Sequence, residues 1–329
     1  MEGLHSMIGS FLNKTIDDIA LTGLSAPYSG KVRQSYDAPG GRKIIVATDR
    51  LSAFDRQITT IPLKGQVLTQ LSRYWFEKTQ DICPNHVIAY PDPNVVVCRT
   101  LNMLPVELVV RGYLAGSTGT SILRMYKAGR RTMYGVTFPD GMRDCQKLDH
   151  PIITPTTKAG VAEHDAPLTP QQVVAENIVD QATWNTVSAY ALALFARGQE
   201  IAATRGLILA DTKYEFGVLP DGTILLGDEI HTPDSSRYWI GETYQQRLDA
   251  GEMPDTLDKD VVRRWLTAHC DPYNDPIPTI PDEVRIATAE TYISVYEKIT
   301  GEKLALPDAA GDPAKRIQTA VQDYLAGNP

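Results

Sequence analysis

Residues 211–229 read DTKYEFGVLPDGTILLGDE, and they predict a β-hairpin in the second half of the chain. Apolar residues flank Asp221-Gly222, a dipeptide favoured where both central residues of a turn have positive φ. If this pair forms the whole loop, Glu215 lies directly opposite Asp228. Like charges in opposed positions destabilise a sheet. The hairpin therefore needs a feature that offsets this repulsion.

The first strand of the hairpin carries charges at every second position. Asp211, Lys213 and Glu215 share one face of the strand, and Asp228 joins them across the ladder. This face is either solvated, with an incidental salt bridge, or binds a divalent cation between Glu215 and Asp228. Carboxylates without a nearby His or Cys favour Mg²⁺ over zinc. Since Mg²⁺ usually keeps positions for water and phosphate, the second reading indicates a nucleotide.

Composition limits the classes of protein that remain. The chain has 329 residues, 43% of them hydrophobic and 22% charged, which is typical of a soluble globular protein with about two domains. A net charge of −8 argues against a general nucleic-acid-binding surface. The sequence contains no apolar run of about 20 residues, so no membrane span is expected.

The first 15 residues and the cysteines indicate the compartment. MEGLHSMIGSFLNKT lacks a basic segment followed by an apolar one, so no secretory signal is expected. The cysteines are too dispersed for a metal knuckle or a CxxC pair, and we expect reduced thiols in a cytoplasmic protein. They are Cys83, Cys98, Cys145 and Cys270.

The first third of the chain reads as β-rich. In residues 30–37, GKVRQSYD, alternation puts Lys31 and Arg33 on one strand face, which suits a flap over phosphates. An exposed strand face without function is the alternative. A helix is expected at 66–79, and we place the domain boundary near residue 105.

Two further segments combine an arginine with hydroxyl groups. VVRGYLAGS (109–117) brings Arg111 near Ser117, and TPDSSRYW (232–239) contains Asp234 and Arg237. Arginine forks and hydroxyls suit a phosphate monoester, and an aspartate suits ribose hydroxyls. Each segment alone could equally form a loop ion pair, but together with the acids they favour a site. Walker A, GxGxxG and HExxH motifs are missing.

An ordered set of motifs resembles a known family. GKVRQSYD, TDRLSAFD, IPLKGQVLTQLSRYWF, PVELVVRGYLAGS, TPTTKA, ADTKYEFG and GDEIHTPDSSRYW lie between residues 30 and 240. Together they resemble the SAICAR synthetases, the phosphoribosylaminoimidazole-succinocarboxamide synthases of purine biosynthesis. Gln34 departs from the acidic residue that is common at its position. The length is similar to that of the longer form of the family.

The resemblance implies a reaction and a fold. Family members use ATP and Mg²⁺ to join L-aspartate to the carboxylate of carboxyaminoimidazole ribonucleotide (CAIR), giving SAICAR, ADP and phosphate, with an acyl phosphate as the suggested intermediate. The implied fold is two-lobed α+β. Residues 1–105 would form a β-rich lobe similar to that of protein kinases, and residues 106–329 a larger α/β lobe with C-terminal helices.

The resemblance also implies a role for individual residues. Those implied to contact ATP are Lys31 and Arg33 at the phosphates and Met103, Leu104 and Glu107 at the adenine hinge. Those implied to hold Mg²⁺ are Glu215 and Asp228, in agreement with the hairpin pattern. Those implied to bind CAIR are Arg111, Ser117 and Arg237 at its phosphate, Asp234 at its ribose, and Lys213 with Asp211 as the catalytic pair at its base and carboxylate. Those suggested for L-aspartate are Lys158, His164 and Asp165 in the long loop 150–168.

Two other classes of protein share some of these features. A kinase-like small-molecule phosphotransferase would use the same ATP and Mg²⁺ groups, but HRD and DFG motifs are missing from the sequence. A non-catalytic nucleotide sensor would not need two arginine–hydroxyl segments beside a metal pair. The ligase is therefore the favoured prediction. It would act on small molecules, without nucleic acid or membrane, as a monomer or a small homo-oligomer.

Overall fold

The computed structural model describes the whole chain except residues 1, 55, 117, 159–165, 258–259 and 329. The chain divides into two compact units. Unit 1 comprises Met1–Tyr74, His86–Thr100 and Leu257–Pro329, and unit 2 comprises Trp75–Asn85 and Leu101–Thr256. The chain passes between the units four times, at 74/75, 85/86, 100/101 and 256/257, and the crossing at 100/101 is close to the expected boundary at 105. The C-terminal residues 257–329, expected in the second domain, belong to unit 1.

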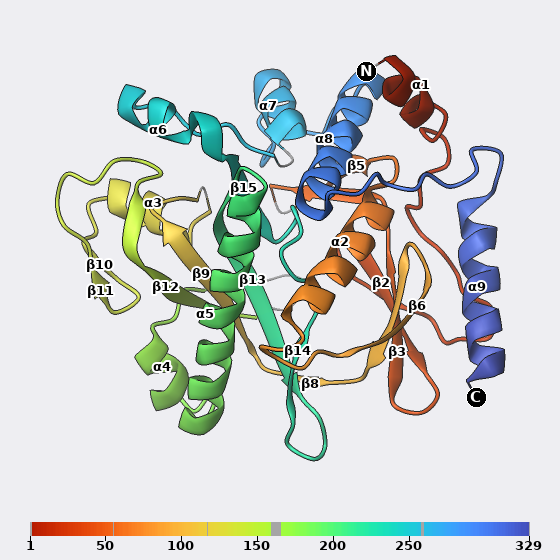
Figure 1. Ribbon diagram of the computed structural model, residues 1–329, viewed down its shortest axis with the longest axis horizontal. Helices are drawn as coiled ribbons and strands as arrows, with labels where there is room; N and C mark the ends of the chain where they lie inside the picture. Colours follow the sequence, from red (N-terminus) through yellow and green to blue (C-terminus); the bar gives the residue numbers. More distant parts are fainter. Residues whose placement is uncertain (1, 55, 117, 159–165, 258–259, 329) are drawn as a thin grey trace. The chain divides into compact units, whose positions relative to one another are not determined.

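Unit 1 contains a five-stranded antiparallel sheet. In spatial order its strands are β1 (Tyr28–Ser29), β2 (Arg33–Ala38), β3 (Arg42–Ala47), β7 (Val95–Arg99) and β6 (Val87–Asp92). Apolar side chains such as Ile44 and Val97 alternate along the strands, as one buried face requires. They pack with Ile317 and Val321 of α9 (Pro313–Gly327), which lies beside β6 (Figure 1).

The remaining elements of unit 1 are a short hairpin and several helices. The hairpin consists of β4 (Arg50–Ala53) and β5 (Arg56–Thr60). The helices are α1 (Glu2–Gly9), α2 (Lys64–Thr79), α7 (Asp260–His269) and α8 (Asp282–Thr300). Helices α1 and α7 both pack on α8. The predicted helix at 66–79 is confirmed as α2, whose last turn falls in unit 2.

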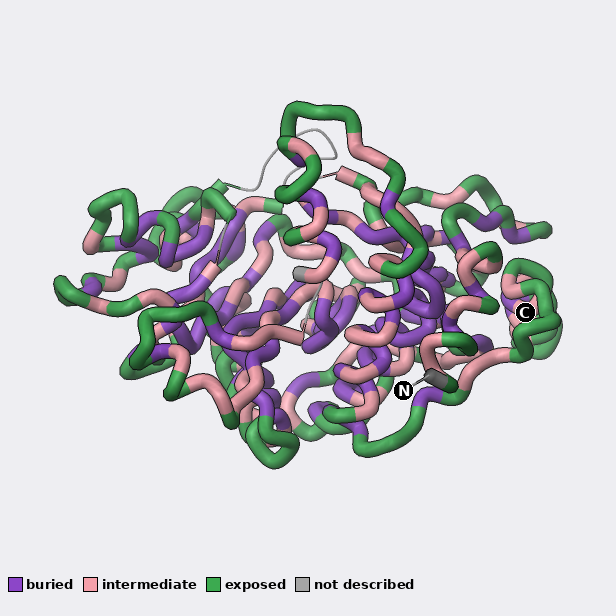
Figure 2. Tube along the Cα trace, turned by 90° about the horizontal axis from the view of Figure 1, so that it is seen from above, coloured by how far each residue is buried: buried purple, intermediate pink, exposed green. Residues whose placement is uncertain are grey.

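Unit 2 contains a six-stranded sheet with β13 (Leu207–Val218) at its centre. The other strands are β12 (Lys147–Thr157), β9 (Val106–Tyr113), β14 (Ile224–Gly227), β15 (Ser236–Ile240) and β8 (Asn102–Met103). Nine of the 12 residues of β13 are buried. Figure 2 colours the chain by burial, with buried segments inside and many exposed residues in the outer loops. A strand buried on both faces holds its side chains in fixed positions, which suits a strand that carries a site.

Helices and a small hairpin complete unit 2. They are α3 (Ile122–Lys127), α4 (Pro170–Ala175), α5 (Gln181–Thr204), α6 (Gly241–Ala250), β10 (Thr132–Met133) and β11 (Val136–Thr137). The 24-residue helix α5 packs on β13 (Figure 1). Helix α4 begins with the predicted capping box, in which Thr169 and Gln172 satisfy each other's backbone N–H groups.

The predicted register of the hairpin is wrong by one residue. Glu215 pairs with Gly227, not with Asp228. The loop has three residues, because the N–H of Leu219 donates to the carbonyl of Thr223, and Gly222 takes a φ of 88°. Three-residue hairpin loops with a glycine in the left-handed region are a common alternative to the two-residue turn. Pro220 belongs to this loop and not to the strand.

The predicted strand face that Lys31 shares with Arg33 is also wrong. Strand β2 begins at Arg33, and Lys31 lies in the bend between β1 and β2. The N–H of Gly30 donates to the carbonyl of Arg33 and closes this bend. From Arg33 onward the alternation is confirmed, since Gln34 and Tyr36 are buried and their neighbours are half-buried or exposed.

Two expectations from composition concern the whole chain. The four cysteines are not disulfide-bonded. Among the described residues, the helices are too short or too polar to span a membrane.

Candidate functional site

One face of the unit 2 sheet carries a row of charged residues across three strands. In the register, Asp211 on β13 lies opposite Arg111 on β9 and opposite Arg237 on β15. Lys213 and Glu215 follow at two-residue steps along β13, and their side chains contact each other. The predicted common face of Asp211, Lys213 and Glu215 is therefore correct.

The first cluster on this face joins two arginines through one carboxylate. Nη1 of Arg111 lies 3.0 Å from Oδ2 of Asp211, and Nη1 of Arg237 lies 2.5 Å from the same oxygen. Nε of Arg111 donates to Oγ1 of Thr154 at 2.9 Å. Burial lowers the pKa of Arg111, while the adjacent Asp211 raises it. Two guanidinium groups outnumber one carboxylate, so the cluster attracts an anion.

The two arginines differ in exposure. The side chains of Arg111 and Asp211 are each 4% exposed, whereas that of Arg237 is 26% exposed. Arg111 is thus held by its partners inside the sheet, and Arg237 presents the face of the cluster that a ligand can reach. Thr154 was not predicted as part of the site. Its signal in the sequence is its position in the TPTTKA motif, on the strand beside β9.

A glycine lets the loop after β9 approach the arginine cluster. Gly116 has a φ of 109°, and a Cβ atom there would lie 2.5 Å from Cβ of Ser121 and 3.4 Å from Nη1 of Arg111. Ser117, predicted as a phosphate ligand, lies outside the described residues. Asp234, predicted for the ribose, is half-buried in the loop before β15, where its N–H donates to Oγ1 of Thr232 at 3.3 Å.

The second cluster surrounds the ammonium group of Lys213. Its Nζ lies 3.3 Å from a carboxylate oxygen of Glu107, 3.3 Å from one of Asp228, and in contact with Glu215. Burial lowers the pKa of Lys213, but the three carboxylates raise it well above its ordinary value. Lys213 is therefore a fixed positive charge and not a neutral base. Nζ of Lys158 also contacts Glu215, at 2.5 Å.

Glu215 and Asp228 meet although their register differs from the prediction. Asp228 lies one residue beyond β14, and its φ of 59° is in the left-handed region. From there its carboxylate reaches the same ammonium group as Glu215. Lys213 thus offsets the repulsion that the sequence pattern left open.

The cluster has the donor chemistry of a Mg²⁺ site without being a complete one. All three acids offer oxygen ligands, which Mg²⁺ prefers. Within the part of the chain that the structure describes, no group of three or more His, Cys, Asp or Glu is arranged to hold a metal ion. Two carboxylates supplemented by phosphate oxygens and water would complete the coordination.

The residues predicted for adenine lie in β8, in β9 and in the segment between them. Met103 pairs with Gly217, and the N–H of Leu104 donates to the carbonyl of Phe216 at 2.9 Å. That N–H is therefore used within the protein. The carboxylate of Glu107 contacts Lys213, a role that the sequence pattern did not indicate.

A buried Tyr–His pair supports the loop that carries Asp228. The hydroxyl of Tyr214 lies 2.5 Å from Nε2 of His231, and the ring of Trp75 meets the imidazole edge-on at 4.7 Å. Burial lowers the pKa of His231 to about 3, so the imidazole is neutral. Its φ of 52° and its fixed ring hold the backbone three residues after Asp228. No local pattern in the sequence indicates this pair.

In unit 1, a buried arginine holds the segment that carries Lys31. The Nη2 atom of Arg50 donates to both the carbonyl of Gly30, at 3.0 Å, and the carbonyl of Arg33, at 3.4 Å. Lys31 is exposed and Arg33 is half-buried. Arg50 belongs to the TDRLSAFD motif, but the motif did not indicate that its side chain holds the segment with Lys31. The expected loop 150–168 is wrong for its first part, because residues 150–157 belong to β12. Lys158 follows that strand directly, whereas His164 and Asp165 are outside the described residues.

The fold and the site define a class of protein: a mixed α+β protein whose central sheet carries two arginines bridged by a carboxylate beside a lysine held by three carboxylates. A family model for SAICAR synthetase matches residues 26–280. The chain belongs to the SAICAR synthetase family. It is 54% identical over 314 residues to a putative phosphoribosylaminoimidazole-succinocarboxamide synthase 2 of Agrobacterium fabrum, covering 95% of this chain and 99% of the relative.

Solved structures agree with this membership. A SAICAR synthase from Saccharomyces cerevisiae, complexed with SAICAR, is 32% identical with a TM-score of 0.78, over 89% of this chain and 100% of the other. A SAICAR synthetase in complex with ADP is 26% identical with a TM-score of 0.65, over 85% of this chain and 100% of the other. These matches confirm the predicted family and its mixed α+β fold.

Proposed function

We propose that this protein joins L-aspartate to the carboxylate of CAIR, using ATP and forming SAICAR, ADP and phosphate. The observation that carries the proposal is the row of charges on one sheet face. The Arg111–Asp211–Arg237 cluster suits a phosphate monoester, and the carboxylates around Lys213 suit a metal-bound phosphoryl group. The relatives with SAICAR and ADP support the same pair of ligands.

In this proposal the CAIR phosphate binds the exposed side of Arg237. Arg111 acts from within the sheet, where Thr154 and Asp211 fix its guanidinium plane. A planar guanidinium group that is already held by two partners loses little conformational freedom when it binds an anion. We assign Ser117 to the same phosphate and Asp234 to the ribose, as the family resemblance implies.

Activation of the CAIR carboxylate would take place beside Lys213. A carboxylate is a poor acyl donor because its leaving group would be oxide. Transfer of the terminal phosphoryl group of ATP to a carboxylate oxygen makes an acyl phosphate and releases ADP. Lys213, held positive by three carboxylates, stabilises the negative charge of the carboxylate and of the transferring group. Asp211 supports this step by orienting both arginines.

Magnesium would be held by Glu215 and Asp228 and would supply charge neutralisation at the phosphates of ATP. The carboxylate of Glu107 contacts the same ammonium group, that of Lys213. It would supply a third oxygen ligand if it turned from Lys213 toward the metal. We assign Lys31 and Arg33 to the phosphates of ATP. We assign Met103 and Leu104 to adenine, and the N–H of Leu104 already donates to the carbonyl of Phe216.

The amine of L-aspartate would then attack the acyl carbon, the C–O bond to phosphate would break, and the ammonium formed would lose a proton. We assign Lys158, His164 and Asp165 to the carboxylates of L-aspartate. Lys158 supports this through its contact with Glu215, which puts a cation beside the activation site. The four thiols support a reducing, cytoplasmic compartment, and we propose a monomer or a small homo-oligomer.

Oxygen tracing tests the acyl phosphate. CAIR labelled with ¹⁸O in its carboxylate should pass one labelled oxygen to the inorganic phosphate formed in each turnover. Mass spectrometry of the phosphate measures this. Phosphate without label, with SAICAR still formed, would contradict the proposed intermediate.

A further inference from the structure

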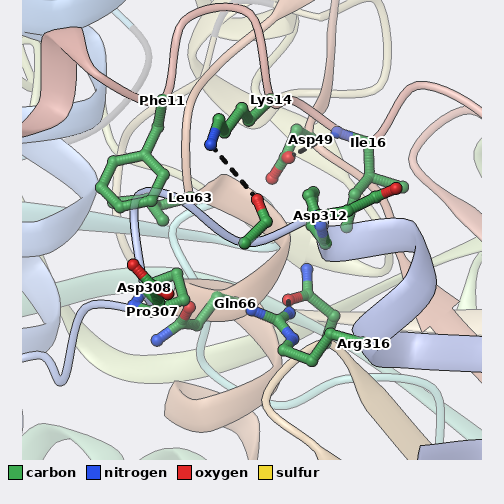
Figure 3. Close-up of a pocket in the computed structure, with 13 residues that line it drawn as sticks. Phe11, Lys14, Ile16, Asp49, Leu63, Gln66, Pro307, Asp308, Asp312 and Arg316 are labelled. Carbon is green, nitrogen blue, oxygen red and sulfur yellow. Dashed lines mark hydrogen bonds between the residues drawn. The ribbon is translucent and has the colours of Figure 1, made fainter. Parts of the chain in front are cut away.

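A cavity of about 200 Å³ lies in unit 1, between the N-terminal segment, the start of α2 and the segment before α9 (Figure 3). Its apolar wall includes Phe11, Ile16 and Leu63, which are all buried. Two buried polar residues, Asp49 and Gln66, also line it. None of the residues assigned to ATP, CAIR, L-aspartate or Mg²⁺ borders this cavity.

Gln66 presents an acceptor that lacks a donor. Its side chain is 2% exposed, and its Nε2 donates to the carbonyl of Ala305 at 2.6 Å. Because a carbonyl only accepts, this bond fixes which end of the amide is nitrogen. Among the residues that the structure describes, none donates to the buried Oε1 atom. A buried acceptor of this kind needs a partner, and the cavity has room for one.

Asp49 offers further acceptor capacity on the same cavity. One carboxylate oxygen accepts from the N–H of Ile16 at 2.7 Å and the other from the N–H of Gly65 at 2.9 Å. A carboxylate has about four lone-pair sites, so each oxygen can accept a second donor. Burial raises the pKa of Asp49 to about 6, and a cationic donor would stabilise its charged form.

The charges at the mouth of the cavity favour a cation. Asp308 and Asp312 are exposed at the rim. The two cations at the rim have partners in the protein. Nζ of Lys14 contacts the carbonyls of residues 309 and 311, and Arg316 forms two hydrogen bonds, of 2.7 and 3.1 Å, with the carboxylate of Asp92. The lining residues thus include three acids, with Asp49, and two cations, and Arg316 and the nearby Lys64 lower the pKa of Asp49.

We propose that this cavity binds a small molecule with a cationic N–H group, an amidine or a primary amine, on a compact apolar body. The apolar body would pack on Phe11 and Leu63, and the N–H group would donate to Gln66 and Asp49. The size is adequate, since an apolar cavity of about 150 Å³ binds benzene. The assignment does not depend on the ligase reaction.

Benzamidine and benzoate form a matched pair of probes, because they share a ring and differ in charge and in N–H donors. We expect benzamidine to shift the ¹H–¹⁵N signals of Gly65 and Gly311 in the full chain in a saturable manner, with benzoate causing no saturable shift. Gly65 is a direct reporter because its N–H bonds to Asp49. Absence of a saturable shift with benzamidine, or equal affinity for benzoate, would overturn the proposal without any variant.

Two glutamine variants locate the binding. Gln66→Met removes the acceptor at nearly constant length and should weaken benzamidine binding at least tenfold. Gln318→Met is the control, because Gln318 lies on α9 in the same unit and its Oε1 already accepts from the N–H of Thr22 at 2.8 Å. Its affinity should equal that of the wild type. A Gln66→Met protein that melts cooperatively and binds benzamidine as tightly as the wild type would refute the site.

Discussion

Replacing Arg237 with methionine tests the CAIR phosphate site. The change removes the guanidinium group of a side chain that is 26% exposed and keeps most of the aliphatic stem. Loss of a hydrogen bond to a charged group costs about 1.5–3 kcal/mol. At about 1.4 kcal/mol per decade, KM for CAIR should rise roughly 10- to 100-fold. KM for ATP should change far less, because the assigned ATP contacts are elsewhere.

The structure also predicts that this variant remains folded. Asp211 keeps Arg111 at 3.0 Å when Arg237 is lost, so its buried charge stays paired. Arg111→Met is different, because it breaks a pair in which both side chains are 4% exposed, and such a break costs about 3–5 kcal/mol of folding free energy. Arg237 is therefore the cleaner probe of binding.

Steady-state kinetics with CAIR and ATP varied in turn, together with thermal melting, measure both effects. Arg197→Met is a matched control in unit 2. Its guanidinium forms two bonds, of 3.1 and 2.9 Å, with Asp81, away from the charged sheet face, so neither KM should change. An equal rise of both KM values in Arg237→Met, or an unchanged KM for CAIR, would refute the phosphate assignment.

Three further predictions follow from the remaining contacts. Glu215→Gln should lower kcat by at least 100-fold and raise the Mg²⁺ concentration needed for half-maximal rate. It should not stabilise the protein, since Lys213 already offsets the charge of Glu215. A normal Mg²⁺ dependence would count against the metal site. Lys31→Ala should raise KM for ATP several-fold with the melting temperature unchanged, because Lys31 is exposed in a bend; a large fall in melting temperature would show a structural role instead. His231 has a folded pKa of about 3, below its unfolded value near 6.5, so its contribution to stability is complete above pH 6.5 and decreases as the pH falls. His231→Asn, which suits the positive φ, should therefore lose less melting temperature than the wild type between pH 7 and 5, and equal losses would contradict this.

The alternation in the sequence was sufficient to predict the face of β13. Side chains in a strand alternate strictly, so Asp211, Lys213 and Glu215 had to share a face once the strand was recognised. Their partners on β9 and β15 are more than 20 residues away in the sequence, and the motifs indicated them only through the family resemblance. The pairing of Asp211 with two arginines depends on sheet order, which local pattern does not contain.

The errors arose where one residue changes the geometry. Asp221-Gly222 fits both a two-residue and a three-residue loop, and the presence of Pro220 in the loop shifts the register by one. The left-handed backbone at Asp228 then restores its contact with Lys213. The C-terminal residues 257–329 joined unit 1 through long-range packing, such as that of α8 with α1, which periodicity within each helix cannot reveal.

Formation of ADP in the presence and absence of each substrate tests the central claim most directly. With Mg²⁺-ATP, the purified protein should release ADP at the catalytic rate only when both CAIR and L-aspartate are present, and SAICAR should appear in equal amount. ADP release at the full rate with CAIR alone and without SAICAR, or with an unrelated hydroxyl acceptor, would show a phosphotransferase and contradict the account.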